Sequence, residues 1–279
     1  MVRKSDGLGK MLLKNWSAQV AFLLLLIFAI WWLFINPFNV ETLVDRKHFW
    51  TASYFLLSLF GGTYGLFISR HWGGVRSVLG RSLAAFSLGL LLQTFGQVAY
   101  NFYTIVAQVE TPYPSVGDIG YFGSIPAYIY GVILLGKAAG LRVSFRSLTN
   151  QFVAITLPLL MLIGSYWFFL RGYEFDWSNP LTVFLDFGYP LGQAIYVSIA
   201  LLVLITSRRV LGGIMRKPLV LLLVALLIQY TGDFNFLFQA HRGAWYAGSW
   251  GDFLFVVSYF FMTVALFFIG TAFRKIKAS

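Results

Sequence analysis

The sequence contains no cysteine, and only 11% of its 279 residues are charged. Without cysteine there is no disulfide framework, no thiolate metal site and no thiol nucleophile. A soluble domain carries about 25% charged residues, so this chain has too few to cover a surface in water. Histidine is also scarce, and His48, His71 and His241 all lie near the ends of apolar runs. These absences exclude a soluble or disulfide-stabilised protein.

Motifs for catalysis and cofactor binding are missing too. The sequence has no His-Glu-x-x-His, no P-loop, no nucleophile elbow, and no lysine inside an apolar run to hold retinal. Its acidic residues are scattered with no histidine nearby, which does not favour a metal site. We therefore predict that the protein is not an enzyme and has no catalytic residue, cofactor or metal.

Long apolar runs are abundant, since 58% of the residues are hydrophobic. A transmembrane helix needs about 20 such residues, and a helix satisfies its own backbone in lipid. We predict an all-α membrane protein with eight transmembrane helices arranged as four hairpins, in one integral membrane domain over residues 1–279. The first run has no small-residue cleavage site after it and is taken as a span rather than a signal peptide. The predicted spans lie near 17–36, 50–69, 82–107, 118–137, 150–170, 181–206, 217–239 and 250–271.

The distribution of positive charge predicts the orientation. Of the 21 lysines and arginines, only Arg46, Lys47, Arg171 and Arg242 lie on one side of these spans. The positive-inside rule places the other 17, and with them both termini, in the cytoplasm. The net charge of +11 is then a topology signal on a face that meets anionic lipid. We expect a multi-pass protein of the cytoplasmic membrane whose surroundings are the lipid bilayer and which does not bind nucleic acid.

A repeat relates the third and fourth predicted spans to the seventh and eighth. The segment "LLLQTFGQVAYNFY" aligns with "LLIQYTGDFNFLF", and "PSVGDIGYFGSIPAYIYGVILLG" aligns with "GSWGDFLFVVSYFFMTVALFFIG". The matched pairs are Gln93 with Gln229, Gly96 with Gly232, Gln97 with Asp233, Ser115 with Ser249, and Asp118 with Asp252. Both hairpins run in the same sense, which indicates a parallel repeat about an axis along the membrane normal.

Asp118 and Asp252 each follow a serine by three residues, at the start of an apolar run. Ser-x-x-Asp in this position is a capping box, in which the acid also meets the positive end of the helix. Capping alone explains both residues, although a binding role stays open. Asp186 lies deeper in its run, beyond Pro180, and capping explains it less well.

Asp233 lies well inside the seventh predicted span, where no cap is available. An ionisable group at that depth is costly and by default indicates function. Gln93, Gln97 and Asn101 are spaced by four residues and share one helix face, and Gln229 and Asp233 form a matching stripe. With Asp118, Asp186 and Asp252 they could line one ligand pocket in the outer half of the bilayer. The alternative is a network of interhelical hydrogen bonds. We interpret the aromatic residues, including Tyr121, Tyr189, Trp245 and Tyr259, mainly as interfacial belts and lipid-facing bulk. The alternative for some of them is the floor of a pocket for a ring or an acyl chain.

Three segments resemble the multi-span N-terminal membrane sensor domain of bacterial diguanylate cyclases and sensor histidine kinases. They are "PYPSVGDIGYFGSIPAYIYGVILL", "DFGYPLGQAIYVSIALLVL" and "QYTGDFNFLFQAHRGAWYAGSWGDFLFVVSYFFMTVAL". The matching residues are Pro114, Ser115, Asp118 and Tyr121, then Tyr189, Pro190, Leu191 and Gly192, then Asp233 and Asp252. The likeness extends over roughly residues 80 to 272 and implies a module that senses a small ligand. In that family the signal passes to a cytoplasmic catalytic domain, which we do not expect in this chain.

Our first hypothesis is thus a sensory or ligand-binding membrane module that acts through a separate cytoplasmic or membrane signalling partner. An alternative is a small secondary transporter that uses Asp233 as its protonatable site. A second alternative is a structural membrane subunit whose polar groups only hold helices together.

Overall fold

The structure is a computed structural model that describes residues 15–35, 44–138, 148–167, 171, 173, 175–207, 216–242 and 244–277. Within these residues every regular element is helical, which confirms the all-α prediction. Seven of the described helical stretches are long and apolar enough to cross a membrane. The chain is therefore a multi-pass membrane protein.

Each predicted span overlaps a helix, with two differences in detail. The second span is split into α3 and α4, which meet at Tyr54, and α5 continues into a π-helical turn, η3. The predicted span at 150–170 overlaps α7, which is not among the seven candidates, and residues 168–170 lie outside the described part of the chain. The elements are α2 (Trp16–Ile35), α3 (Val44–Ser53), α4 (Phe55–His71), η2 (Gly74–Arg76), α5 (Val78–Asn101), η3 (Phe102–Val106), α6 (Gly117–Ala138), α7 (Leu148–Ser165), α8 (Pro180–Ser207), α9 (Arg216–His241) and α10 (Trp250–Lys277).

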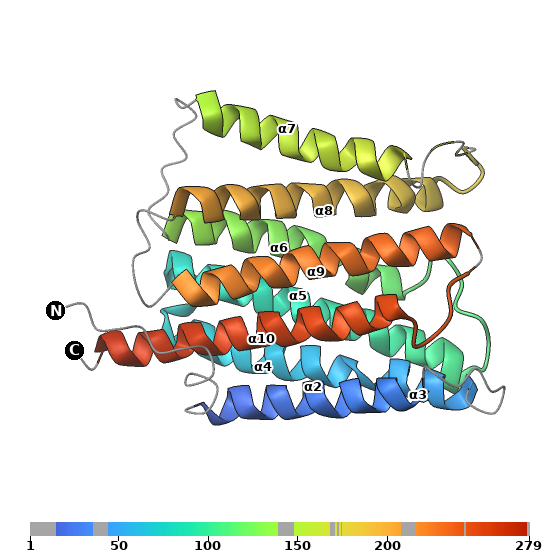
Figure 1. Cartoon of the computed structure of the whole chain (residues 1–279), viewed down its shortest axis with the longest axis horizontal. Helices are drawn as coiled ribbons and strands as arrows, with labels where there is room; N and C mark the ends of the chain where they lie inside the picture. Colours follow the sequence, from blue (N-terminus) through green and yellow to red (C-terminus); the bar gives the residue numbers. More distant parts are fainter. Residues whose placement is uncertain are drawn as a thin grey trace.

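Six helices form a closed ring in which each packs against the next, in the order α4, α5, α6, α8, α9, α10 and back to α4. The remaining two long helices lie outside the ring, α2 against α10 and α7 against α8 (Figure 1). The loop 107–116 and the described residues of the loop between α9 and α10 (242 and 244–249) lie at one end of the ring, and α10 finishes at the other (Figure 1). We call the first of these the loop end of the bundle.

The repeat predicted from the sequence is visible as a repeated contact between helices. A methyl group on Gly96 of α5 would lie 2.7 Å from the ring of Tyr121 on α6. On Gly232 of α9 it would lie 3.0 Å from the ring of Phe255 on α10. Tyr121 and Phe255 each follow the aspartate of their hairpin by three residues. Small residues of this kind let transmembrane helices approach closely. Each hairpin therefore has a glycine packed against an aromatic ring at the equivalent position.

Away from the loop end, apolar side chains fill the interior of the ring. They include Phe86, Leu135, Leu222 and Phe267, which are all fully buried. Buried polar side chains gather nearer the loop end, among them Gln93, Gln97 and Asp252. The interior is therefore apolar in one half and polar in the other, and the polar half contains the candidate site.

Candidate functional site

A cavity of about 430 Å³ lies inside the ring at the loop end. Its wall includes residues from α3, α5, α6, α8, α9 and α10 and from both loops of that end. It lies between the two repeated hairpins, α5–α6 and α9–α10. Its volume is within the usual range for small-molecule sites, about 300–1,000 Å³.

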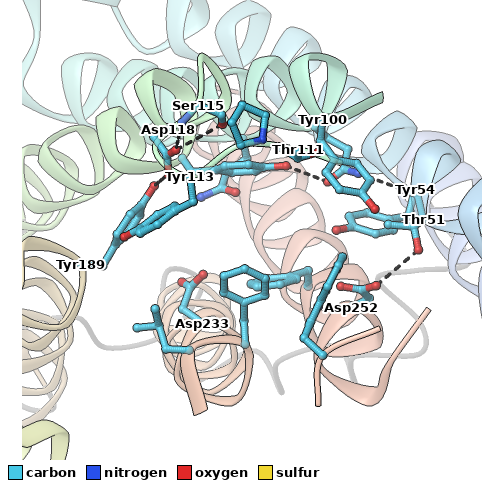
Figure 2. Close-up of a pocket in the computed structure, with 18 of the residues that line it drawn as sticks. Thr51, Tyr54, Tyr100, Thr111, Tyr113, Ser115, Asp118, Tyr189, Asp233 and Asp252 are labelled. Carbon is cyan, nitrogen blue, oxygen red and sulfur yellow. Dashed lines mark hydrogen bonds between the residues drawn. The ribbon is translucent and has the colours of Figure 1, made fainter. Parts of the chain in front are cut away.

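Three aspartates line the cavity. Asp118 lies at the start of α6, while Asp233 on α9 and Asp252 on α10 lie on the opposite side (Figure 2). All three were predicted from the sequence as binding residues, and the fold brings them to one place although they are distant in the chain. No Lys, Arg or His is found among the described residues of the wall.

Asp118 completes the capping box predicted from the sequence. One of its carboxylate oxygens, Oδ2, accepts hydrogen bonds from the backbone N–H of Ser115 at 2.7 Å and from the Ser115 hydroxyl at 3.2 Å. The Ser115 hydroxyl oxygen in turn accepts from the N–H of Gly117 at 3.1 Å. The other carboxylate oxygen of Asp118, Oδ1, accepts from the hydroxyl of Tyr189 on α8 at 2.7 Å. With three donors on its carboxylate, Asp118 is well satisfied by the protein itself.

Asp252 occupies the equivalent position in the second hairpin but has different partners. Its Oδ2 accepts from the N–H of Gly248 at 2.7 Å and from the hydroxyl of Thr51 on α3 at 3.3 Å. Gly248 has a φ of +75°, which glycine adopts at little cost, and its carbonyl accepts from the indole N–H of Trp32 on α2 at 3.0 Å. The capping interaction of Asp252 is therefore tied to α2 and α3.

Asp233 is the least satisfied of the three. Among the described residues, the side-chain amide of Gln229, one helical turn earlier, donates to its carboxylate at 3.3 Å. The carboxylate faces the cavity (Figure 2). A charged group at this depth has lost its hydration and lacks a strong partner in compensation.

The amides of the α5 stripe form bonds between helices. Gln93 donates to the hydroxyl of Ser124 at 2.8 Å and accepts from the hydroxyl of Tyr259 at 3.0 Å. Gln97 donates to the carbonyl of Thr51 at 3.0 Å and accepts from the hydroxyl of Tyr121 at 3.0 Å. Both line the cavity, yet their hydrogen-bonding groups are used within the bundle. Gln93 and Gln97 therefore join helices of the bundle and also line the cavity.

Three other predicted residues do not line the cavity. Asn101 donates to the carbonyl of Ala52 at 2.7 Å and so joins α5 to α3. Gln229 borders a separate space of about 10 Å³ behind Asp233. Asp186 accepts from the hydroxyls of Tyr113 and Tyr173, each at 2.7 Å. It therefore ties two loops to α8 instead of facing a ligand.

The hydrogen bonds to Asp186 affect the two loop tyrosines. Desolvation, followed by the hydrogen bond to Asp186, raises the pKa of Tyr173 to about 12. The same two causes, in the same order, raise the pKa of Tyr113 well above its usual value. Both phenols therefore remain protonated donors at neutral pH.

Nine of the 19 residues that line the cavity are aromatic. Trp245 lies edge-to-face with Tyr100 at 6.3 Å and with Phe236 at 5.7 Å between ring centroids. Tyr259 contacts Tyr54 and Phe255 at 6.2 and 6.5 Å. We call these three-ring groups the Trp245 wall and the Tyr259 wall. Their members all line the cavity.

Aromatic residues are what the sequence analysis mainly missed. Tyr121, Tyr189, Trp245 and Tyr259, which were interpreted mainly as interfacial residues, line the cavity. Thr51, Tyr54, Tyr100, Thr111 and Tyr113 also line it and were not predicted. Only the repeat could have indicated one of them, because Tyr100 aligns with Phe236. Tyr54 lies at the break between α3 and α4, and Thr111 and Tyr113 lie in a loop, where helical periodicity gives no signal. Thr51 lies in the short helix α3, where no sequence pattern indicated it.

Comparison with protein-family models, with curated proteins and with solved structures finds no match for this chain. The described residues contain no group of three or more His, Cys, Asp or Glu side chains placed to hold a metal ion. The function is therefore inferred from the geometry and chemistry of the cavity.

Proposed function

We propose that this protein is a sensory or ligand-binding integral membrane module, with the 430 Å³ cavity as its ligand site. The observation that supports this most is the placement of Asp233 and Asp252 in one cavity, among aromatic rings and without a cation in its described wall. Groups that only held helices together would be paired and closely packed. Asp233 and its cavity meet neither condition.

The proposal includes eight spans, with α7 as the fifth, and both termini in the cytoplasm. In support, Arg70, Arg76, Arg81, Lys137 and Lys217 lie at the end of the bundle opposite the cavity. Among the residues that the structure describes, only Arg46, Lys47, Arg171 and Arg242 lie at the loop end. By the positive-inside rule the cavity then faces the exterior of a cytoplasmic membrane.

The signal would pass through the ring helices to a separate protein. An occupant of the cavity contacts both repeated hairpins and so alters their separation. Pro126 in α6 and Pro190 in α8 interrupt the hydrogen bonding of their helices, and such positions let helices bend. Movement of the α5–α6 and α9–α10 hairpins at the cytoplasmic end is what a signalling partner would detect.

Thermal unfolding of the detergent-purified protein tests the site. Wild type, Asp233→Asn and Asp252→Asn are each heated with polar and lipid fractions of a cell extract. The control is Asp176→Asn, which removes the same charge at an exposed position outside the cavity wall. We expect one fraction to raise the melting temperature of wild type and of the control by several degrees, because a ligand of the native state stabilises it. The two cavity variants should lose most of that rise.

An identical response of all four proteins would contradict the proposal and favour a structural subunit. Proton-dependent uptake of the active fraction into proteoliposomes, abolished by Asp233→Asn, would favour the transporter instead. Co-purification with a kinase or cyclase, sensitive to the active fraction, would support the sensory role.

A further inference from the structure

We propose that the ligand is an organic cation, an ammonium or quaternary ammonium group carried on a small apolar or aromatic body. This inference rests on the proposed ligand-binding function of the cavity and names the chemical class that fits it. It combines the charge of the cavity, the arrangement of its aromatic rings and the positions of the nearest cationic side chains.

The described wall of the cavity contains acidic side chains and no cationic one. Asp233 and Asp252 face it from α9 and α10, and Asp252 is only 3% exposed. A buried carboxylate is stable when a cation or several hydrogen bonds offset its lost hydration. Asp118 has three donors and Asp252 accepts from Gly248 and Thr51, whereas Asp233 has a single long bond from Gln229. A cationic ligand would therefore stabilise the ionised form of Asp233 most, and that of Asp252 to a lesser degree.

Two cationic side chains of the loop end stack on aromatic rings outside the cavity wall. The ammonium group of Lys47 lies over the ring of Tyr246 at 5.2 Å, and the guanidinium of Arg242 lies over the ring of Phe238 at 4.0 Å. Neither residue is part of the described cavity wall. Both lie at the loop end, and neither pairs with the carboxylates of the cavity.

Aromatic rings enclose the space beside the carboxylates. The Trp245 wall and the Tyr259 wall both contribute ring surface to the cavity. Ring faces attract ammonium groups, and tryptophan and tyrosine do so best. Desolvated rings combined with carboxylates are the usual recognition site for a quaternary ammonium group. A neutral ligand would use the rings but would leave Asp233 with its single long hydrogen bond, and an anion would find no cationic partner in the described wall.

A pair of ligands that differ only in charge tests the inference. The probes are benzyltrimethylammonium and its uncharged carbon isostere neopentylbenzene, titrated calorimetrically into protein purified in a maltoside detergent. Potassium chloride at equal ionic strength controls for salt. We expect the cation to bind at least tenfold more tightly than the isostere. Asp233→Asn and Asp252→Asn should each lower cation affinity at least tenfold, while Asp176→Asn leaves it unchanged.

Equal affinity for the cation and the isostere would overturn the inference but leave a ligand-binding cavity in place. The same holds if the aspartate variants bind the cation as wild type does. Failure of the folded protein to bind any of a graded set, from methylammonium to benzyltriethylammonium, would also overturn it. The response to cell extract in the previous experiment would then decide the proposed function independently.

The cation could be a free amine or the headgroup of a lipid, and the bilayer distinguishes the two. The titration is repeated in nanodiscs of phosphatidylglycerol alone and in nanodiscs that also contain phosphatidylcholine or phosphatidylethanolamine. Weaker apparent binding of the probe in the mixed discs identifies the headgroup as the competing ligand. Unchanged binding identifies a free amine.

Discussion

Gly120 of α6 lies directly against the backbone of Leu92 on α5. A methyl group on Gly120 would overlap the carbonyl oxygen of Leu92 and would lie 2.6 Å from the amide nitrogen of Gly96. Because these neighbours are backbone atoms, no side-chain rotation can relieve the overlap. This close approach holds together the hairpin that carries Asp118, Gln93 and Gln97.

Gly120→Ala should therefore force α5 and α6 apart. We expect it to lower the unfolding free energy by about 1–3 kcal/mol, the usual cost of overpacking, measured by denaturant titration in detergent micelles. Gly123→Ala on the same helix is the control, because its methyl group would be 3.8 Å from Leu92 Cδ1 and alanine favours the helix. Equal losses in both variants would contradict the close packing of this hairpin.

The two serines related by the repeat should differ in their contributions. Ser115 accepts from the N–H of Gly117, so Ser115→Ala should cost about 0.5–2 kcal/mol, as loss of an N-cap does. The hydroxyl of Ser249 is buried and has no hydrogen-bond partner within the described structure. Ser249→Ala should consequently be neutral or slightly stabilising. A larger loss for Ser249→Ala than for Ser115→Ala in the same titration would show that the caps are assigned the wrong way round.

Stability at alkaline pH should depend on Tyr173. The folded-state pKa of this phenol is raised to about 12, above the ordinary value of about 10. Its contribution to stability is therefore fully present below pH 10 and is lost as the pH rises toward 12. Tyr173→Phe keeps the ring contacts with Phe175 and Phe187 but lacks the hydrogen bond to Asp186. Melting temperatures from pH 8 to 12 should fall less steeply in the variant, and parallel curves would contradict the prediction.

The sequence was sufficient to predict the helices, the duplicated hairpins and the acids of the cavity. Long apolar runs have one stable form in lipid, and an acid inside such a run is too costly to be incidental. The capping box of Asp118 followed from the spacing of Ser115 and Asp118 alone. These predictions depend only on local chemistry along the chain.

The closure of the ring and the rotation of each helix were not predictable in the same way. Membrane helices are apolar on every side, so periodicity does not show which face points inward. Asn101 continues the stripe of Gln93 and Gln97, yet it bonds to Ala52 because α3 packs there. Asp186 was grouped with the cavity acids, but Tyr113 and Tyr173 reach it from loops whose paths only the folded chain defines.

Gln97 and Asp233 occupy equivalent positions in the two hairpins, and this difference makes the two sides of the cavity chemically unequal. The side-chain amide of Gln97 is hydrogen-bonded to Thr51 and Tyr121, whereas the carboxylate of Asp233 faces the cavity. Two related hairpins thus enclose a space whose opposite sides are chemically unlike. A ligand with distinct ends would be held there preferentially in one of its two orientations, so an enclosure built by duplication would distinguish head from tail.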